Sequence, residues 1–397
     1  MKTNKKQKNI SDGWKPMKLS SLFDIRRGGS PRPINEFITT REDGLNWLKI
    51  GDIEKGAKYI NTTSSKILKE GLSRTTLVKK GDFILSNSMS FGRPYILNID
   101  TCIHDGWLTF QDLNLDLLNR EFLYFLLLHP KTQNEFVTIS AGSGVQNLKK
   151  ETVSEVSLLF PPLLEQNRIV SVLETWDSGI EKLKRKIAIK KEIKKGLMQE
   201  LLTGKKRLPG FDDKWEKVQI GELLDYEQPT NYIVDSTEYE DSYLTPVLTA
   251  GKTFILGYTN EENNIFPQGN LPVIIFDDFT TANKFVDFKF KVKSSAMKIL
   301  SVKDNSISDI YFVYNAIQLL RYISAEHKRT YISEYQFLDI SLPSIGEQKA
   351  IKKILKNSDQ EIENLKKKLE YFMDQKKYLL NNLVTGQIRT PENLNVE

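Results

Sequence analysis

Two segments of the chain carry apolar side chains at alternating steps of four and three residues, with mostly lysine and glutamate between them. The positions of the stripe are Ile169, Leu173, Trp176, Ile180, Leu183 and Ile187 in the first segment and Ile351, Leu355, Ser358, Ile362, Leu365, Leu369 and Phe372 in the second, where Ser358 is the one polar member. This spacing places one narrow apolar stripe along a helix, as in the seam of a coiled coil. Pro209 and Pro391 come only after Gly204 and Gly386, which mark the expected helix ends. The pattern predicts two helices of about 35 residues, each about 50 Å long at about 1.5 Å per residue.

An apolar stripe of this kind needs a partner that covers it. Because one chain holds two matching stripes, we expect the helices to pair with each other as an antiparallel coiled coil and to give the chain an approximate two-fold axis. Pairing between two copies of the chain is the alternative, but inexpensive loop closure within one chain favours the first arrangement. The first helix also carries a basic run: Lys182, Lys184, Arg185, Lys186, Lys190, Lys191, Lys194 and Lys195. This run is either a solvated face or a strip that follows a DNA backbone, and the sequence leaves both interpretations open.

The helical segments belong to a longer internal duplication. Residues 161–169 (PPLLEQNRI) recur 182 positions later as residues 343–351 (PSIGEQKAI), and the match continues without a gap to Pro209 and Pro391. In a second match, residues 14–24 resemble residues 215–225, which lie 201 positions later. The chain therefore alternates two variable segments, which share little beyond their first residues, with two fixed helical segments.

Each variable segment mixes short strand-like and helix-like runs. Residues 82–85 and 273–276 have the pattern of buried strands, and residues 122–128 and 311–320 that of core helices. We therefore expect an α/β or α+β fold in which two such domains alternate with two long helices. The expected boundaries are a basic N-terminal tail at 1–13, a first variable domain at 14–158, a helical spacer at 159–213, a second variable domain at 214–340 and a second helical spacer at 341–397.

Polar loops rich in Arg, Asn, Gln, Ser and Gly separate the elements of both variable domains. Arg can read guanine edges, Asn and Gln can read adenine edges, and Lys, Ser and exposed backbone amides hold phosphates. Loops of this composition are also ordinary turns, so each contact is a hypothesis. The candidate nucleic-acid contacts are Arg26, Arg27, Arg32, Asn87, Ser88, Arg93, Ser143, Gln146 and Asn147 in the first domain, and Asn231, Tyr232, Lys252, Thr280, Thr281, Asn283, Lys284, Lys328, Arg329 and Tyr331 in the second.

Composition narrows the setting but does not identify a partner. The formal charge of +6 and the pI of about 8.9 permit a polyanionic partner without requiring one. Cys102 is the sole cysteine, which excludes an internal disulfide, and the three histidines are too scattered for a structural zinc site. The chain has no signal peptide pattern and no apolar run of about 20 residues, so we expect a soluble, cytoplasmic protein without membrane contact.

The sequence also lacks the motifs of the common catalytic sites. The segment 251–253 (GKT) resembles the end of a phosphate-binding loop, but Pro246 stands where that motif needs glycine. No Gly-x-Gly-x-x-Gly follows a strand, and no Asn-Pro-Pro-Tyr-type signature of an amino-methyltransferase is present. Asp277 and Asp278 lack the downstream carboxylate–lysine pair of a nuclease and are better explained as a turn cap. We expect no catalytic residue, no metal site and no cofactor bound by this chain.

The duplicated plan resembles the specificity subunit of type I restriction–modification enzymes. The motifs that carry the resemblance are Pro161, Glu165 and Gln166, their repeats Pro343, Glu347 and Gln348, and the Thr-Gly helix ends at 203–204 and 385–386. The resemblance covers essentially the whole chain from Trp14 to Pro391. The sequence departs from the pattern at Ser344, which replaces the second proline of the pair, and in its shorter second variable domain.

The resemblance implies a non-catalytic DNA-binding subunit of a phage-defence system. In that family each variable domain, called a target-recognition domain, reads one half of a split DNA target, and the conserved helices form an antiparallel coiled coil that sets the gap. Two modification subunits, which are adenine-N6 methyltransferases, dock on the specificity subunit, and restriction (translocase–nuclease) subunits join them. AdoMet, ATP and Mg²⁺ belong to those partners.

The resemblance also implies roles for the residues of the fixed segments. The positions expected to bind the partner subunits or to form the spacer are Glu165, Gln166, Ile169, Leu173, Ile180, Leu183, Glu347, Gln348, Ile351, Leu355, Ile362 and Leu365. Two alternatives remain: a coiled-coil scaffold whose end domains bind proteins, and a specificity partner of another restriction–methylase type, such as a single-chain system.

Overall fold

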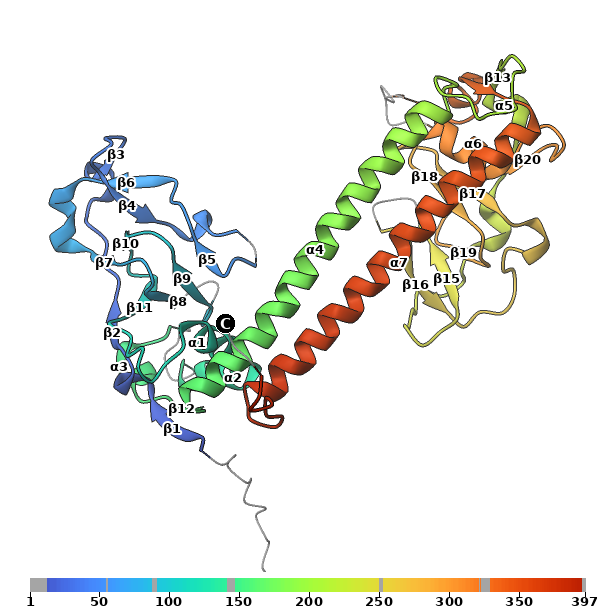
Figure 1. Ribbon diagram of the computed structural model, residues 1–397. Coiled ribbons are helices and arrows are strands. Elements are labelled where there is room, and N and C mark those ends of the chain that lie inside the picture. The colour runs from blue at the N-terminus through green and yellow to red at the C-terminus, as the bar shows by residue number, and fades with distance from the viewer. Residues whose placement is uncertain are drawn as a thin grey trace, which may run out of the picture. The chain divides into compact units, whose positions relative to one another are not determined.

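The computed structural model describes residues 13–54, 56–87, 91–140, 147–249, 253–320, 322 and 329–394 (Figure 1). The chain divides into two compact units. The first comprises residues 1–182 and 369–397, and the second comprises residues 183–368. Each unit is a mixed α/β body, so the chain has the two-domain α/β layout that the sequence predicts.

Two long helices dominate the fixed segments. Helix α4 spans Leu163–Leu201 and helix α7 spans Ile345–Leu383, with 39 residues in each. Both bounds are related by the 182-residue offset of the sequence repeat. Each helix contributes one part to each unit, since the unit boundaries fall after residues 182 and 368.

In the first unit, the beginning of α4 lies beside the end of α7. The rings of Trp176 and Phe372 meet edge to face with centroids 5.0 Å apart. A side chain at Gly179 would lie 3.3 Å from the Phe372 ring, so glycine leaves room for the helices to approach closely at this point. Lys376 Nζ also lies 2.5 Å from an oxygen of Asp177.

In the second unit, the end of α4 lies beside the beginning of α7. Lys194 Nζ is 2.5 Å from Asp359, and Lys190 Nζ is 2.8 Å from Glu361. Lys194 and Asp359 occupy the same repeat positions as Lys376 and Asp177, so both units use the same ion pair. Two lysines of the predicted basic run are therefore engaged with α7, and they are not part of a solvated face or an unoccupied DNA-binding strip.

The first unit contains two five-stranded sheets. One has the order β3 (Ile38–Thr39), β6 (Ser65–Ile67), β4 (Leu45–Leu48), β10 (Thr101–Ile103) and β7 (Thr76–Val78). The other has the order β2 (Asp24–Arg27), β11 (Trp107–Gln111), β8 (Phe83–Ser86), β9 (Pro94–Leu97) and β5 (Tyr59–Ile60). Helices α1 (Arg120–Leu128), α2 (Pro130–Ser140) and α3 (Lys150–Ser154) follow, and β1 (Lys15–Lys18) pairs with β12 (Ser157–Phe160).

The second unit has a four-stranded and a three-stranded sheet. The four-stranded sheet has the order β14 (Leu224–Glu227), β20 (Met297–Val302), β17 (Val273–Asp277) and β18 (Asn283–Val286). The three-stranded sheet has the order β16 (Ile255–Thr259), β15 (Thr245–Leu248) and β19 (Lys291–Val292). Helices α5 (Ile220–Leu223) and α6 (Ile310–Ile317) complete the domain, and β13 (Glu216–Gln219) pairs with β21 (Asp339–Leu342). In both units, the strand that opens the variable domain thus pairs with the strand that closes it.

The sequence pattern located the core elements well and overextended one helix. The expected strands at 82–85 and 273–276 correspond to β8 and β17, and the expected helix at 122–128 lies within α1. Helix α6 ends at Ile317, three residues earlier than the apolar run suggests. Leu319 and Leu320 continue the apolar pattern in a turn that packs against the same core. In the parts of the chain that the structure describes, no helix combines the length and apolarity needed to cross a membrane.

Candidate nucleic-acid interface

A buried carboxylate joins the first variable domain to the fixed helices. Glu165, in the first turn of α4, is 2% exposed. Trp14 Nε1, at the entrance to the domain, donates to it at 3.2 Å. Arg389, beyond the end of α7, donates from Nη2 at 2.7 Å and also from Nε. The domain entrance, a helix start and a helix end therefore meet at one side chain.

Glu347 forms the same junction in the second unit. This residue is 1% exposed in the first turn of α7. Arg207 donates to its two carboxylate oxygens from Nε and Nη2, each at 2.8 Å, and Trp215 Nε1 donates at 2.9 Å. The hydrogen bond to Glu347 raises the pKa of Arg207 above its ordinary value. Trp14 and Trp215 also pack edge to face on Phe122 and Phe312, the third residues of α1 and α6.

The neighbouring glutamine connects each long helix to the core helix of its domain. Gln166 accepts from the backbone N–H of Asn119 at 2.8 Å and donates to the carbonyls of Leu117 and Pro161, both at 2.9 Å. Gln348 repeats these bonds with Asp309 N–H at 2.8 Å and the carbonyls of Ile307 and Pro343 at 2.9 and 2.8 Å. Asn119 and Asp309 are the N-caps of α1 and α6. The motif thus aligns a core helix with a long helix in each unit.

Of the two roles expected for the Glu-Gln motif, these contacts favour a part in the spacer over partner binding. The side chains of Glu165, Gln166, Glu347 and Gln348 are at most 2% exposed, so they are not available to a partner subunit. Their polar groups are occupied within the chain. Of the apolar positions, Ile169, Leu173, Ile351 and Leu355 lie in the domain cores, Ile180, Leu183 and Ile362 are buried farther along the helices, and Leu365 is half-buried.

The candidate DNA contacts fall into three groups by exposure. Arg26, Arg27, Arg32, Asn231, Thr280, Lys284 and Arg329 are exposed; Arg93, Asn147, Tyr232, Thr281 and Asn283 are half-buried; Asn87 and Tyr331 are buried. Ser88, Ser143, Gln146, Lys252 and Lys328 lie outside the described residues. The exposed group is basic apart from Asn231 and Thr280, as a phosphate-contacting surface requires.

Two of these positions are corrected because their side chains are inside the domains. Asn87 is 1% exposed and donates from Nδ2 to the carbonyl of Asp105 at 3.0 Å. Tyr331 is 0% exposed and packs against the rings of Tyr226 and Phe276. Burial also raises the pKa of Tyr331 above its ordinary value. Both residues support the loops rather than present groups to a ligand.

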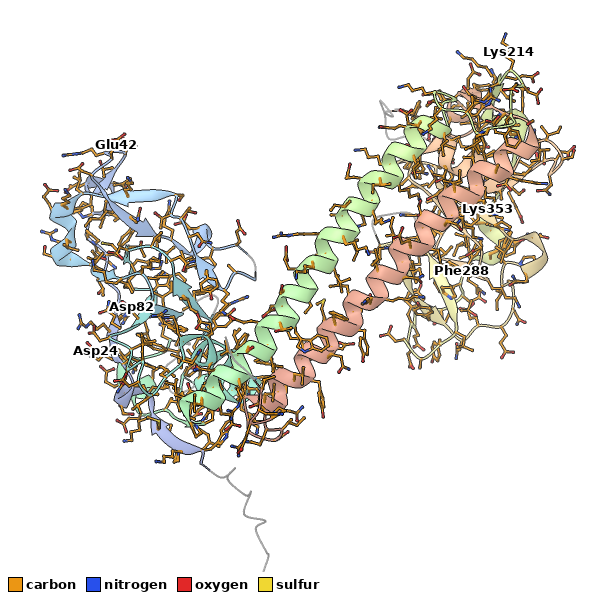
Figure 2. The ribbon with its side chains drawn as sticks, in the orientation of Figure 1. Asp24, Glu42, Asp82, Lys214, Phe288 and Lys353 are labelled. Atoms are coloured by element: carbon orange, nitrogen blue, oxygen red, sulfur yellow. The ribbon has the colours of Figure 1, made fainter. Side chains whose placement is uncertain are left out.

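In the first unit, three arginines are exposed and one of them, Arg32, lines a hollow. Arg26 and Arg27 are on β2, which begins at Asp24 (Figure 2), and Arg26 Nε is 2.6 Å from Asp24. The side chain of Arg32 is 81% exposed and lies 3.9 Å from Asp105. Next to it is a hollow of about 840 Å³ lined by Ser30, Pro31, Arg32, Pro33, Ile34, Asn35, Ile38, Trp47, Lys49, His104 and Asp105. Cations beside apolar and aromatic surface suit phosphates together with the apolar edge of a base.

In the second unit, Thr280, Thr281, Asn283 and Lys284 belong to the hairpin between β17 and β18. Asp277 accepts from the backbone of Phe279 and from Thr280 Oγ1, and Thr281 has a φ of 58°. Asp277 therefore caps the turn that presents Thr280, and Lys284 follows the turn on β18. Asp278 lies 3.5 Å from Lys298 in the interior, and both side chains are at most 3% exposed.

Tyr232 is held by its surroundings. Its hydroxyl donates to Glu227 at 2.9 Å and its ring packs on Phe266. Burial, with the nearby Glu227 carboxylate, raises the pKa of Tyr232 to about 12. Its hydroxyl therefore remains protonated at neutral pH.

Among the described residues, no cluster of three His, Cys, Asp or Glu side chains could hold a metal ion.

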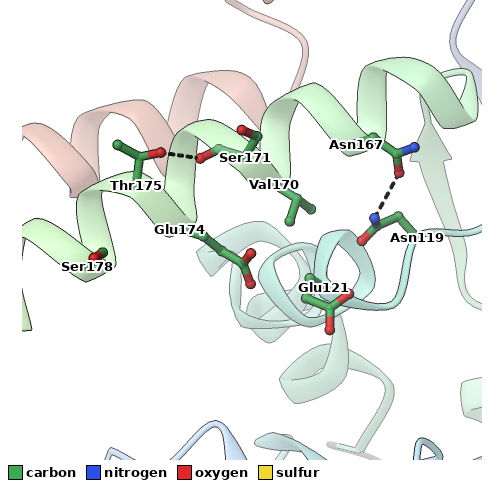
Figure 3. A pocket seen from close by; sticks show the side chains of 8 residues that line it. All are labelled: Asn119, Glu121, Asn167, Val170, Ser171, Glu174, Thr175 and Ser178. Carbon is green, nitrogen blue, oxygen red and sulfur yellow. Dashed lines mark hydrogen bonds between the residues drawn. The ribbon is translucent and has the colours of Figure 1, made fainter. Parts of the chain in front are cut away.

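Sequence reasoning missed a polar hollow between α4 and α1. It has a volume of about 590 Å³ and is lined by Asn119, Glu121, Asn167, Val170, Ser171, Glu174, Thr175 and Ser178 (Figure 3). Asn119 Nδ2 donates to Asn167 Oδ1 at 2.8 Å across it. At the matching repeat positions α7 carries Lys349, Lys352, Lys353 and Lys356 in place of Asn167, Val170, Ser171 and Glu174. Comparing the repeats position by position would have revealed this difference in charge.

The geometry defines a protein that presents two α/β domains, each fixed to long helices by the same buried junction. A model of the type I restriction modification DNA specificity domain matches residues 11–191 and 212–371. The chain therefore belongs to the type I restriction–modification DNA specificity family. Members of this family are the specificity subunits of these systems, which recognise DNA and are not catalytic.

Individual relatives agree with this assignment. The chain is 48% identical over 148 residues to the EcoR124I/EcoR124II type I restriction enzyme specificity subunit of Escherichia coli, an alignment that covers 37% of this chain and 36% of that protein. It is 23% identical over 427 residues to the MjaVIII specificity subunit of Methanocaldococcus jannaschii, covering 97% of this chain and 95% of the relative. The crystal structure of the S subunit from M. genitalium has the same fold, with a TM-score of 0.58 at 18% identity over 95% of this chain and 97% of that chain.

Proposed function

We propose that the two variable domains are target-recognition domains, each of which reads one half of a bipartite DNA target. The observation that carries the proposal is the Trp–Glu–Arg junction, which occurs once in each unit with the same donors and the same acceptor. A repeated junction attaches two dissimilar domains to equivalent places on two equivalent helices. This arrangement suits a subunit that must place two different reading surfaces on one DNA.

The long helices act as the spacer in this proposal. We infer that α4 and α7 pair as an antiparallel coiled coil with an approximate two-fold axis and thereby set the gap between the half-sites. The repeated Lys–Asp pairs, Lys376 with Asp177 and Lys194 with Asp359, support this inference because each unit joins the beginning of one helix to the end of the other.

The bases are read by exposed loop residues in the major groove, at half-sites separated by roughly one helical turn. The revised contact set keeps the exposed and half-buried candidates and omits Asn87 and Tyr331. Arg32 and Lys284 are exposed cations in this set; Arg32 lines the hollow and Lys284 follows the β17–β18 turn.

The chain works in this proposal with catalytic partners in the cytoplasm. Two modification subunits, acting as adenine-N6 methyltransferases, bind the outer faces of the fixed helices, and restriction subunits join the complex. AdoMet, ATP and Mg²⁺ are used by those subunits. The lysine-bearing face of α7, where Figure 2 labels Lys353, is a surface we assign to a modification subunit.

Fluorescence anisotropy on a library of bipartite duplexes, with and without a modification subunit, tests the proposal. We expect binding to depend on two short blocks of sequence at one separation. Binding without any sequence preference, even with the partner present, would instead favour a scaffold whose end domains bind proteins. Sequence-dependent binding that requires a single-chain restriction–methylase would favour the other alternative.

Exchange of one domain separates the two halves of the reading function. Replacing residues 14–158 with the corresponding domain of another specificity subunit is expected to change one block of the recognised sequence. A change in both blocks would contradict independent recognition domains.

A further inference from the structure

A lysine of the first unit connects the edge of a sheet to α4. Lys58 directly precedes β5, the edge strand of the β2-β11-β8-β9-β5 sheet. The backbone N–H of Ile96 on β9 donates to the carbonyl of Lys58 at 3.0 Å and holds this segment on the sheet. The Lys58 side chain is 18% exposed, and its Nζ lies 2.9 Å from Oε1 of Glu174 on α4.

Aromatic rings surround the ammonium group of Lys58. Its Nζ lies 5.0 Å from the ring centroid of Tyr59, 5.4 Å from that of Tyr124 and 5.1 Å from that of Phe125. A cation over aromatic faces is attracted by the ring quadrupole, and more strongly when water is excluded. Burial alone would lower the pKa of Lys58, but the hydrogen bond and charge of Glu174, together with Tyr59, outweigh burial and raise the pKa. The group is therefore charged throughout the physiological pH range.

Three elements meet at this contact. Tyr124 and Phe125 belong to α1, Glu174 belongs to α4, and Lys58 brings the sheet edge to both. Figure 3 shows Glu174 on α4 across the polar hollow from Glu121 of α1. Glu121 in turn accepts a long hydrogen bond of 3.4 Å from the hydroxyl of Tyr59, the residue after Lys58.

The second unit connects its domain to α7 with different chemistry. The repeat position that corresponds to Glu174 is Lys356, which has the opposite charge. There, Tyr311 of α6 donates to Asp359 at 2.5 Å, and Lys352 lies 2.8 Å from the N-cap residue Asp309. The Glu-Gln junction is thus common to both units, whereas this outer contact is particular to each domain.

We propose that Lys58 is a positioning residue that sets the angle of the first recognition domain on α4, and with it the gap length that the complex accepts. The inference rests on the proposed function. The Glu165 junction fixes where the domain is attached but lies at one place on α4, whereas Glu174 is more than two helical turns farther along. A second attachment point on the same helix restricts rotation about the first, and successive base pairs are only about 3.4 Å apart along the DNA.

The test uses the complex of the full chain with its modification subunits. Methylation rates are measured on duplexes that carry the cognate half-sites at the cognate gap and at gaps one base pair shorter and longer. The variants are Lys58→Met, which keeps the aliphatic stem, Glu174→Gln, their double variant, and Lys58→Arg, which retains the charge. Lys80→Met, at an exposed lysine of the same domain, is the matched control.

We expect Lys58→Met and Glu174→Gln each to lower the ratio of cognate to altered-gap rates by about five- to tenfold, and the double variant to lower it no further, because coupled residues are not additive. Lys58→Arg and Lys80→Met should retain the ratio, and the preferred bases of both half-sites should not change in any variant. Glu174 is nearly half exposed on α4, so its variant carries the test if Lys58→Met fails to fold.

The failures of the two claims are distinguishable. A wild-type complex that methylates without preference for a gap would overturn the proposed function itself. A wild-type complex with a gap preference that Glu174→Gln retains would overturn only the role of Lys58. A change in the preferred bases would also overturn it, because it would make Lys58 part of the reading surface.

Discussion

Arg207 and Glu347 form a two-pronged ion pair in which Nε and Nη2 of the guanidinium each lie 2.8 Å from a carboxylate oxygen. The residues are 140 positions apart in the chain. Trp215 adds a third donor from the entrance of the second recognition domain. A buried carboxylate with three charge-matched or polar donors is well satisfied, and loss of one donor leaves part of its desolvation cost uncompensated. The junction therefore fixes the domain on its helix whatever the variable loops contain.

Trp215→Phe should weaken this junction while retaining much of the ring packing on Phe312. We expect the free energy of unfolding to fall by about 1–3 kcal/mol, the usual cost of leaving a buried polar group with a partner missing. Urea unfolding of the chain measures the change. Trp107→Phe is the control for lost ring volume, because Trp107 Nε1 is buried without an acceptor among the described residues. An equal loss in both variants would contradict a specific role for the Trp215 hydrogen bond.

His129 should make the first unit sensitive to acid. Burial, with the charge of Lys131, lowers the pKa of His129 below its ordinary value. As pH falls below about 6.5, the unfolded chain therefore takes up a proton before the folded chain does, and the free energy of unfolding decreases. His104 contributes in the same direction, since burial lowers its pKa as well.

Thermal unfolding between pH 7.5 and 5 measures this dependence. His129→Asn keeps an acceptor for the backbone N–H of Lys131, which donates to Nδ1 at 3.2 Å, and removes the titrating group. The variant is expected to lose stability less steeply on acidification. A pH profile as steep as that of the unsubstituted protein would show that His129 does not control it.

Arg32→Gln should weaken DNA binding through the first half-site. If Arg32 contacts a phosphate, the affinity should fall for all DNA sequences, and the slope of log K against log salt concentration should decrease by about 1. If Arg32 reads guanine, the binding free energy should weaken by about 1–3 kcal/mol, and specificity should relax at one base. Arg41→Gln is the matched control, because Arg41 is also exposed in this domain and is paired with Asp43 at 3.0 Å. Unchanged affinity and salt dependence for Arg32→Gln would remove it from the contact set.

An insertion near Thr203 should lengthen the gap between half-sites. Four added helical residues extend α4 by about 6 Å at about 1.5 Å per residue, which corresponds to one or two base pairs at about 3.4 Å each. The recognised half-sites should not change. Methylation of duplexes with graded gaps measures the shift, and the same insertion at the exposed turn around Gly269 is the control. An unchanged gap after the helix insertion would contradict the spacer role of α4.

The sequence predicted the long helices because their apolar spacing repeats for many turns. It also predicted the buried strands β8 and β17, whose runs of apolar residues are continuous. It could not reveal that Glu165 and Glu347 face inward, because their partners Arg389 and Arg207 are far away in the chain. Charged residues at a helix start are usually solvated, and only the tertiary structure shows which cation meets them.

The candidate site was harder to predict than the fold. Polar residues in loops have the same composition whether they face a ligand or support a turn, as Asn87 and Asp277 illustrate. Lys58 had no sequence signal, since Tyr124 and Phe125 of α1 and Glu174 of α4 are far from it in the chain. The difference in charge between Glu174 and Lys356 was visible in the repeat, but its meaning depended on the contact with Lys58.

Mapping of N6-methyladenine in cells that carry this chain together with its modification subunits tests the central claim most directly. The account predicts one methylated motif made of two short specific blocks separated by a fixed number of unspecified base pairs. A continuous motif, or two blocks methylated at variable separation, would contradict a specificity subunit whose paired helices hold two reading domains at a set distance.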